Sequence, residues 1–208
     1  MTALGDLNQA IYAHASVLQQ STTLSELYGE EESELITLVQ SYRSTREIVE
    51  FTRSMIPGGE TVVPFNRDGD KPVVQLIHHE AELHEELIQQ ISGLKSEGYE
   101  MIAVICKTAA ESLTAYEALS AGLQVKLIKK TTLSFERGVH IIPAYLAKGV
   151  EFDAVLIYDG SNEKYTREAE RKLFYTACTR AMHLLHIFSV GEPSRFIAES
   201  DRSTYEVR

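Results

Sequence analysis

The sequence predicts an α/β fold built on a mostly parallel sheet with helices on both of its faces. Short apolar runs rich in Val and Ile alternate with amphipathic helical patterns along most of the chain. Alternation at these lengths is typical of parallel strands that are joined by crossover helices. The strands are expected at residues 73–77, 101–106, 125–128, 139–142, 154–158 and 184–188.

The predicted helices are recognised by the residues at their boundaries. The first follows a Ser/Thr start, with Glu47 in the position of a capping-box partner. The second ends near Gly98, and the third starts at Thr108 and ends before Gly122. The helices are expected at residues 44–55, 80–96, 108–121 and 168–181.

A connector rich in Pro, Gly and Asp occupies residues 57–72, with a small strand expected at 61–65. It separates a helical piece over residues 1–56 from a sheet domain over residues 73–190. Residues 191–208 are expected to hold a C-terminal helix, and the last ten of them to form an untethered tail.

Bulk composition is that of an ordinary globular domain, because 44% of the 208 residues are hydrophobic. No stretch approaches the roughly 18–20 apolar residues that span a bilayer. The segment from Met1 to Tyr12 lacks the basic-then-apolar plan of a secretory signal. We therefore expect a cytoplasmic protein with no membrane partner. Cys106 and Cys178 lack CxxC spacing, which predicts buried free thiols and neither a disulfide nor a zinc site.

The net charge of −10 argues against a surface that holds nucleic acid by itself. Lys and Arg side chains that neutralise phosphates supply most non-specific affinity for nucleic acids. Any contact with a strand should therefore be local, and the acidic faces are either solvated or meet a basic partner.

Four sequence blocks carry the chemistry. In chain order they are Gly5-Asp6-Leu7-Asn8-Gln9-Ala10-Ile11-Tyr12, Ser41-Tyr42-Arg43-Ser44-Thr45, Lys148-Gly149-Val150-Glu151-Phe152 and Leu173-Phe174-Tyr175-Thr176-Ala177-Cys178-Thr179-Arg180-Ala181. Together they resemble motifs III, IV, V and VI of superfamily I DNA helicases of the UvrD/Rep/PcrA kind. The resemblance implies a RecA-like three-layer domain that is the second motor domain of an ATP-dependent helicase. The first block would be the end of the preceding motor domain.

The resemblance also implies residue roles in an ATP site. Tyr42 would stack on the base and Arg43 would reach the γ-phosphate, while Arg180 would act as an arginine finger across the cleft between domains. A guanidinium suits this task because its planar fork matches phosphate oxygens and stays charged. Glu151 would hold the ribose, and Gln9 would couple the γ-phosphate to the strand-binding surface.

Further roles are expected in the loop before Phe152. Lys148 and Gly149 are expected to contribute to nucleotide binding with Glu151, and a glycine suits a loop that needs a positive φ or a close backbone approach. Many relatives carry a histidine three positions before this lysine and a threonine two positions earlier, where this chain has Tyr145 and Pro143. Tyr145 and Lys148 are the candidate contacts to a single strand, since a tyrosine can stack on any base. This departure resembles the helicase IV-like branch, some of whose members act on RNA polymerase.

The chain lacks a G-x-x-x-x-G-K-[ST] loop and an Asp-Glu motif placed to hold magnesium. The expected cofactor, ATP with Mg²⁺, would therefore be bound mainly by an upstream RecA-like domain, and the chain alone should not hydrolyse ATP. Asp159 ends a strand as a Walker B aspartate does, but without a phosphate loop it is expected to be a turn residue.

The alternative function is a degenerate module that docks a protein such as RNA polymerase or a repair factor. An upstream coding sequence with or without the phosphate loop would discriminate the two.

Overall fold

The computed structural model describes residues 29, 34, 36–132 and 134–208, and the block that contains Gln9 lies outside this part. In the described part, seven parallel strands form one sheet in the order β5-β6-β4-β7-β8-β3-β9. The strands are β3 (Val73–Ile77), β4 (Met101–Cys106), β5 (Val125–Leu127), β6 (Gly138–Pro143), β7 (Phe152–Ile157), β8 (Ala181–Val190) and β9 (Glu206–Val207). All six predicted strands are present, and the predicted α/β class with a parallel sheet is confirmed.

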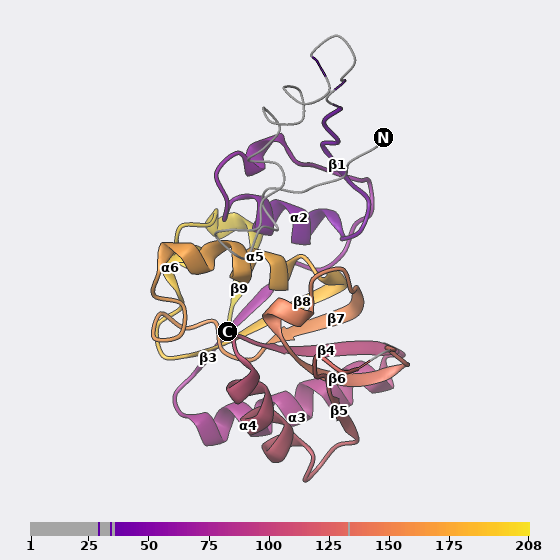
Figure 1. The fold of residues 1–208 in the computed structure, drawn as a ribbon. Coiled ribbons are helices and arrows are strands. Elements are labelled where there is room, and N and C mark those ends of the chain that lie inside the picture. Colours follow the sequence, from indigo (N-terminus) through magenta and orange to yellow (C-terminus); the bar gives the residue numbers. More distant parts are fainter. Residues whose placement is uncertain (1–28, 30–33, 35, 133) are drawn as a thin grey trace.

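Helices cover both faces of this sheet (Figure 1). The four predicted helices are present as α2 (Arg46–Arg53), α3 (Glu80–Ser96), α4 (Ala109–Leu119) and α5 (Arg171–Cys178), and α6 (Arg195–Ala198) follows β8. Short 3₁₀ turns are η4 (Gly59–Thr61), η5 (Ala144–Leu146), η6 (Glu168–Glu170) and η7 (Arg202–Thr204). A separate pair of two-residue parallel strands, β1 (Gln40–Ser41) and β2 (Val63–Pro64), precedes the main sheet.

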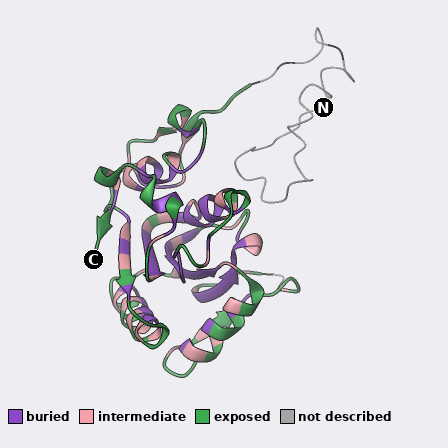
Figure 2. Cartoon of the chain, turned by 90° about the vertical axis from the view of Figure 1, so that its left-hand side faces the viewer, coloured by how far each residue is buried: buried purple, intermediate pink, exposed green. Residues whose placement is uncertain are grey.

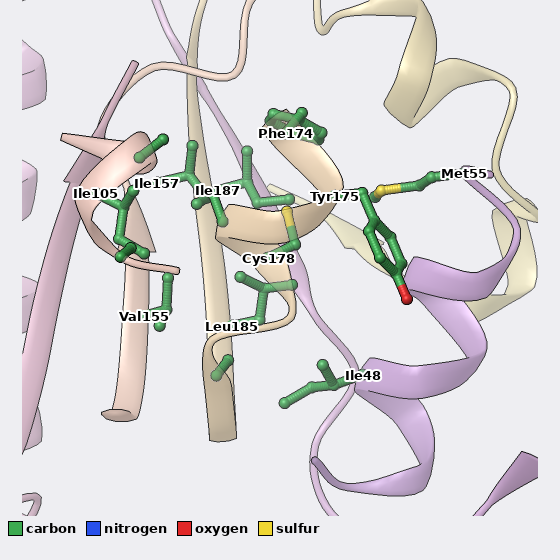
Figure 3. Packing of buried hydrophobic residues seen from close by; sticks show 14 of the residues in the cluster. Ile48, Met55, Ile105, Val155, Ile157, Phe174, Tyr175, Cys178, Leu185 and Ile187 are labelled. Carbon is green, nitrogen blue, oxygen red and sulfur yellow. The ribbon is translucent and has the colours of Figure 1, made fainter. Parts of the chain in front are cut away.

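The core has two layers because successive residues of a strand point to opposite faces. In β4, Ile102 and Val104 pack into the cluster under α3 and α4, while Ala103 and Ile105 pack into the cluster under α2 and α5. Figure 2 shows the buried strands between helices whose outer sides are exposed. On the second face, Figure 3 shows Met55, which follows the C-cap of α2, beside side chains of α5. The central strand β4 is a continuous apolar run because both faces of the sheet are covered there.

The last residues are not the untethered tail that the sequence predicts. Tyr205 is 7% exposed, and its ring lies 5.3 Å from that of Phe51. The next residues form β9, with the amide of Glu206 donating to Pro72 O at 2.9 Å and that of Arg208 to Val74 O at 3.0 Å. One buried aromatic ring therefore anchors an edge strand that has no periodic pattern of its own.

Capping follows the prediction at α4 but not at α2. Thr108 caps α4, since its hydroxyl accepts from the amide of Glu111 at 3.1 Å. At α2, Thr45 makes no side-chain cap, and Glu47 is not a capping-box partner. Its carboxylate instead accepts from the amide of Gly69 at 2.8 Å, so the connector takes the group that a capping box would use.

Candidate functional site

The segment that carries Tyr42 and Arg43 is fixed at the start of β8. Arg180 lies directly before this strand, after the C-cap of α5. The Ser44 hydroxyl donates to Ala181 O at 2.5 Å, and the Thr45 amide donates to Met182 O at 3.1 Å. Ser44 and Thr45 are both buried. Because buried backbone groups are costly to leave unpaired, these bonds hold the two segments in one arrangement.

The loop that ends at Glu151 is the third segment that contacts the start of β8. The Phe152 amide donates to Arg180 O at 3.0 Å, which aligns the starts of β7 and β8. One residue earlier, the Glu151 carboxylate accepts from Nε of Arg43 at 2.5 Å, across 108 positions of sequence. The motif IV, V and VI blocks therefore meet at the amino ends of β7 and β8.

The Arg43–Glu151 ion pair is open to solvent, with the two side chains 33% and 45% exposed. Exposed ion pairs of this kind contribute about 0–1 kcal/mol to the free energy of unfolding, because water screens the charges and both side chains lose conformational entropy. The pair can therefore be exchanged at little cost for a ligand that offers phosphate or hydroxyl groups.

Arg180 has a very different environment, since it is 0% exposed. Its Nε donates to Thr176 O at 3.1 Å and its Nη2 to Thr179 Oγ1 at 3.2 Å, both within the last turn of α5 and its C-cap. A cation at this end of a helix is favourable because the last carbonyls lack partners within the helix. In this arrangement the guanidinium donates hydrogen bonds to the carboxyl end of α5. The role of Arg180 as an arginine finger stays a prediction.

Tyr42 presents an aromatic ring to solvent beside Arg43. It is 64% exposed, its hydroxyl donates to Gln40 Oε1 at 2.8 Å, and its ring lies 4.9 Å from that of Phe65 at an interplanar angle of 40°. An exposed ring held from its edge and one side leaves area on which a flat base can stack.

The turn before Glu151 requires its glycine. Gly149 has φ +86°, a left-handed conformation that other residues adopt at a cost, and a Cβ there would meet nothing within 4 Å. Of the two explanations expected for Gly149, conformation therefore applies and crowding does not. Lys148 is exposed beside it, and Tyr145 is half-buried in η5, with the Lys130 ammonium 5.9 Å from its ring.

Asp159 is a turn residue at the end of β7, as predicted. Its Oδ1 accepts from the amides of Ser161 at 2.9 Å and Val190 at 3.2 Å. Burial raises the pKa of this carboxyl, which these hydrogen bonds partly oppose. Its acceptor capacity is thus used to close the turn into Ser161 and to fasten the end of β8.

Sequence reasoning missed a second charged cluster, at the carboxyl end of β4. The Lys107 ammonium lies 2.9 Å from Glu170 Oε1, and Arg167 approaches the same oxygen at 2.7 Å. Burial disfavours ionisation of Glu170, but hydrogen bonds from Lys107 and Arg167 outweigh it and lower its pKa to about 2. Arg167 and Glu170 are 60 and 63 positions from Lys107 in the sequence, and a lone lysine after a strand does not indicate that such partners exist.

The acidic surface includes an open hollow of about 490 Å³ at the amino ends of β4 and β7. Its lining includes Glu97, Glu100 and Asp153, but the Asp153 carboxylate already accepts from the amides of Glu100 at 3.0 Å and Met101 at 2.8 Å. Among the described residues, no group of three or more His, Cys, Asp or Glu could hold a metal ion. Within the same part of the chain, no helix is both long and apolar enough to cross a membrane.

Comparisons with known proteins agree on one kind of domain. Residues 138–188 match the model of the UvrD-like helicase C-terminal domain. The crystal structure of the C-terminal domain of a possible DNA helicase from Lactobacillus plantarum WCFS1 is similar, with 36% identity and a TM-score of 0.71 over 80% of this chain and 98% of that one.

Two further matches cover a shorter stretch of sequence or show the fold alone. A probable DNA helicase of Mycoplasma pneumoniae is 37% identical over 79 residues, and the match covers 28% of this chain and 15% of that helicase. A structure of a single-substitution variant of Saccharomyces cerevisiae Dbp5 bound to RNA and ADP-BeF3 shares the fold, with 12% identity and a TM-score of 0.51 over 73% of this chain and 47% of that one.

Proposed function

Because the chain belongs to the UvrD-like helicase C-terminal domain family, we propose that it is the second motor domain of an ATP-dependent superfamily I DNA helicase or translocase. In this role it supplies Arg43, Arg180 and Tyr42 to an ATP site that an upstream RecA-like domain completes. The observation that carries the proposal is the meeting of three segments at the amino ends of β7 and β8, where Arg43 pairs with Glu151.

The residues at this meeting point fit a nucleotide. The exposed Tyr42 ring offers a stacking surface for the base, and the Glu151 carboxylate is an acceptor for ribose hydroxyls. Among the contacts that described residues make with Arg43, the ion pair uses Nε, so both Nη groups remain for phosphate oxygens. Magnesium, held mainly by the upstream domain, would neutralise charge on the phosphates.

Closure of the two domains around ATP would alternate their grip on single-stranded DNA and produce stepping. Tyr145 and Lys148 are the proposed strand contacts of this domain, and Gln9 the proposed link between the γ-phosphate and the strand. The net charge of −10 implies that most of the basic groove comes from the upstream domain.

A second candidate function is a degenerate motor domain that docks a protein such as RNA polymerase or a repair factor. The acidic surface and the presence of Pro143 and Tyr145 in the motif V region favour it. Against it, a docking module has no need for an arginine held against a carboxylate beside an exposed tyrosine.

ATP turnover of the full-length gene product that contains this chain tests the proposal, with and without single-stranded DNA. We expect DNA-stimulated hydrolysis and a loss of roughly 10³-fold or more in kcat for Arg180→Ala, the range found for arginine fingers. Arg137→Ala is the matched control, because its side chain is 78% exposed and pairs with Glu100. Turnover that is absent, or indifferent to Arg180, would refute the motor and favour the docking module.

A further inference from the structure

A short stretch of the connector, residues 65–69, runs beside the segment that carries the candidate nucleotide contacts. We name this stretch the brace. It continues β2, whose pairing with β1 sets its register, and the Phe65 amide donates to Ser41 O at 2.9 Å. The Phe65 ring then packs against Tyr42 at 4.9 Å. The brace thus begins by supporting the exposed tyrosine.

The other end of the brace locks the start of α2. The Gly69 amide donates to Glu47 Oε2 at 2.8 Å, and Asp68 forms an ion pair with Arg46. A Cβ at position 69 would lie 2.5 Å from Cγ2 of the buried Thr45, so this close approach requires glycine. Both ends of the brace are therefore fixed against residues 42–47, and Arg67 lies between them.

Arg67 connects the two backbone segments of the candidate site. Its Nη2 donates both to the carbonyl of Arg43 and to that of Met182, the latter at 3.1 Å. Its own carbonyl accepts from the Arg46 amide at 2.8 Å. Arg43 and Met182 are 139 positions apart and belong to the motif IV segment and the strand after motif VI. One guanidinium group therefore ties the backbone that carries the Arg43 side chain to the start of β8.

We propose that Arg67 is a positioning residue for Arg43: it fixes the Arg43 backbone against β8 and so aims the Arg43 side chain at Glu151 and, in the active protein, at the phosphates. A charged donor to two carbonyls holds the backbone more firmly than a neutral donor does. The role at the phosphates rests on the proposed function, whereas the aim toward Glu151 does not. A displacement of about 1 Å at a reacting group can lower a rate by about 10²-fold.

The direct test is the side-chain ¹⁵N–¹H NMR signal of Arg43 Nε, because that group donates to Glu151. In the wild-type chain we expect a resolved signal that Glu151→Gln shifts. Arg67→Ala should produce a comparable shift, and Arg67→Lys, which keeps the charge, should restore the signal at least in part. Arg53→Ala is the matched control, since it removes another guanidinium bond to a connector carbonyl, that of Val62 at 3.3 Å, away from Arg43. Dispersed backbone signals show that each variant is folded.

An Arg43 Nε signal that is unchanged in folded Arg67→Ala would overturn the proposal, whether or not the protein hydrolyses ATP.

Kinetics of the full-length protein then test the role at the phosphates. We expect Arg67→Ala to lower kcat for ATP on the order of 10- to 100-fold. In an Arg43→Ala background the same change should lower kcat less than about 2-fold, because the two residues act as a unit. Losses that multiply would contradict action through Arg43. Absence of ATP turnover in the wild type would refute the motor function and leave the NMR result to decide on Arg67.

Discussion

Acid should destabilise this fold through His186, which lies in the middle of β8. The imidazole is 4% exposed and stacks on Phe188 at 4.5 Å, and its Nε2 shares a hydrogen bond of 2.9 Å with Gln75 Oε1. Burial, and secondarily the charge of Arg208, the residue after β9, lower its pKa from 6.5 to about 4. Nε2 of the same Gln75 side chain donates to Glu86 Oε2 of α3 at 2.8 Å.

The lowered pKa of His186 determines whether acid stabilises or destabilises the fold. The unfolded chain binds the proton with a pKa of 6.5 and the folded chain with one of about 4, so protonation favours unfolding. The free energy of unfolding is unaffected by His186 above about pH 6.5, falls below it and levels off below about pH 4. With 1.36 kcal/mol per pKa unit, the full loss is about 3 kcal/mol, of which about 2 kcal/mol has occurred at pH 5.

Urea unfolding at pH 7.5, 6.5, 5.5 and 5.0 would measure this loss. His186→Gln keeps an amide beside Gln75 but does not titrate, so it should lose about 2 kcal/mol less than the wild type between pH 7.5 and 5. His183→Gln is the control, because His183 is an exposed residue of the same strand and its replacement should leave the wild-type pH dependence. The reasoning fails if His186→Gln and the wild type lose stability in parallel.

Two further predictions concern the candidate site. Gly149→Ala should lower the free energy of unfolding by about 1 kcal/mol, since alanine must adopt φ near +86° there; a denaturation midpoint equal to that of the wild type would contradict this. Tyr42→Ala in the full-length protein should raise the KM for ATP about 10-fold by removing a stacking surface of about 1–3 kcal/mol, while Tyr42→Phe should leave it near the wild-type value. Equal effects of the two changes would show that the hydroxyl bond to Gln40, and not the ring, is what counts.

The fold could be predicted from the sequence to the extent that it is periodic. Buried β4 and residues 154–157 of β7 are continuous apolar runs, and α4 has its cap at Thr108. Elements of two residues, such as β1, β2 and β9, are too short to show a periodic hydrophobic pattern. They form because distant segments pair with them. The same reason explains why the last residues looked untethered in the sequence.

The site could be predicted as separate blocks but not as an assembly. The resemblance to helicase motifs singled out Arg43 and Glu151, but no local sequence pattern indicates that two residues 108 positions apart form an ion pair. Arg67 lies in a stretch rich in turn residues, so a turn was the natural interpretation. Its use as a tie depends on where β8 begins, and the pairing of β8 with β7 and β3 determines that.

Under the proposed function, the two arginines of the site must meet ATP at very different energetic cost. The Arg43–Glu151 pair is partly exposed, so exchanging the carboxylate for a phosphate changes its environment little. Arg180 is wholly buried and serves the end of α5, so reaching a phosphate requires its hydrogen bonds to Thr176 and Thr179 to be replaced. A buried, hydrogen-bonded cation moves only when new partners of similar strength replace the old ones. Binding of ATP can thus begin at Arg43, while engagement of Arg180 requires the closed arrangement of the two domains. This order would link the finger to domain closure and not to nucleotide binding alone.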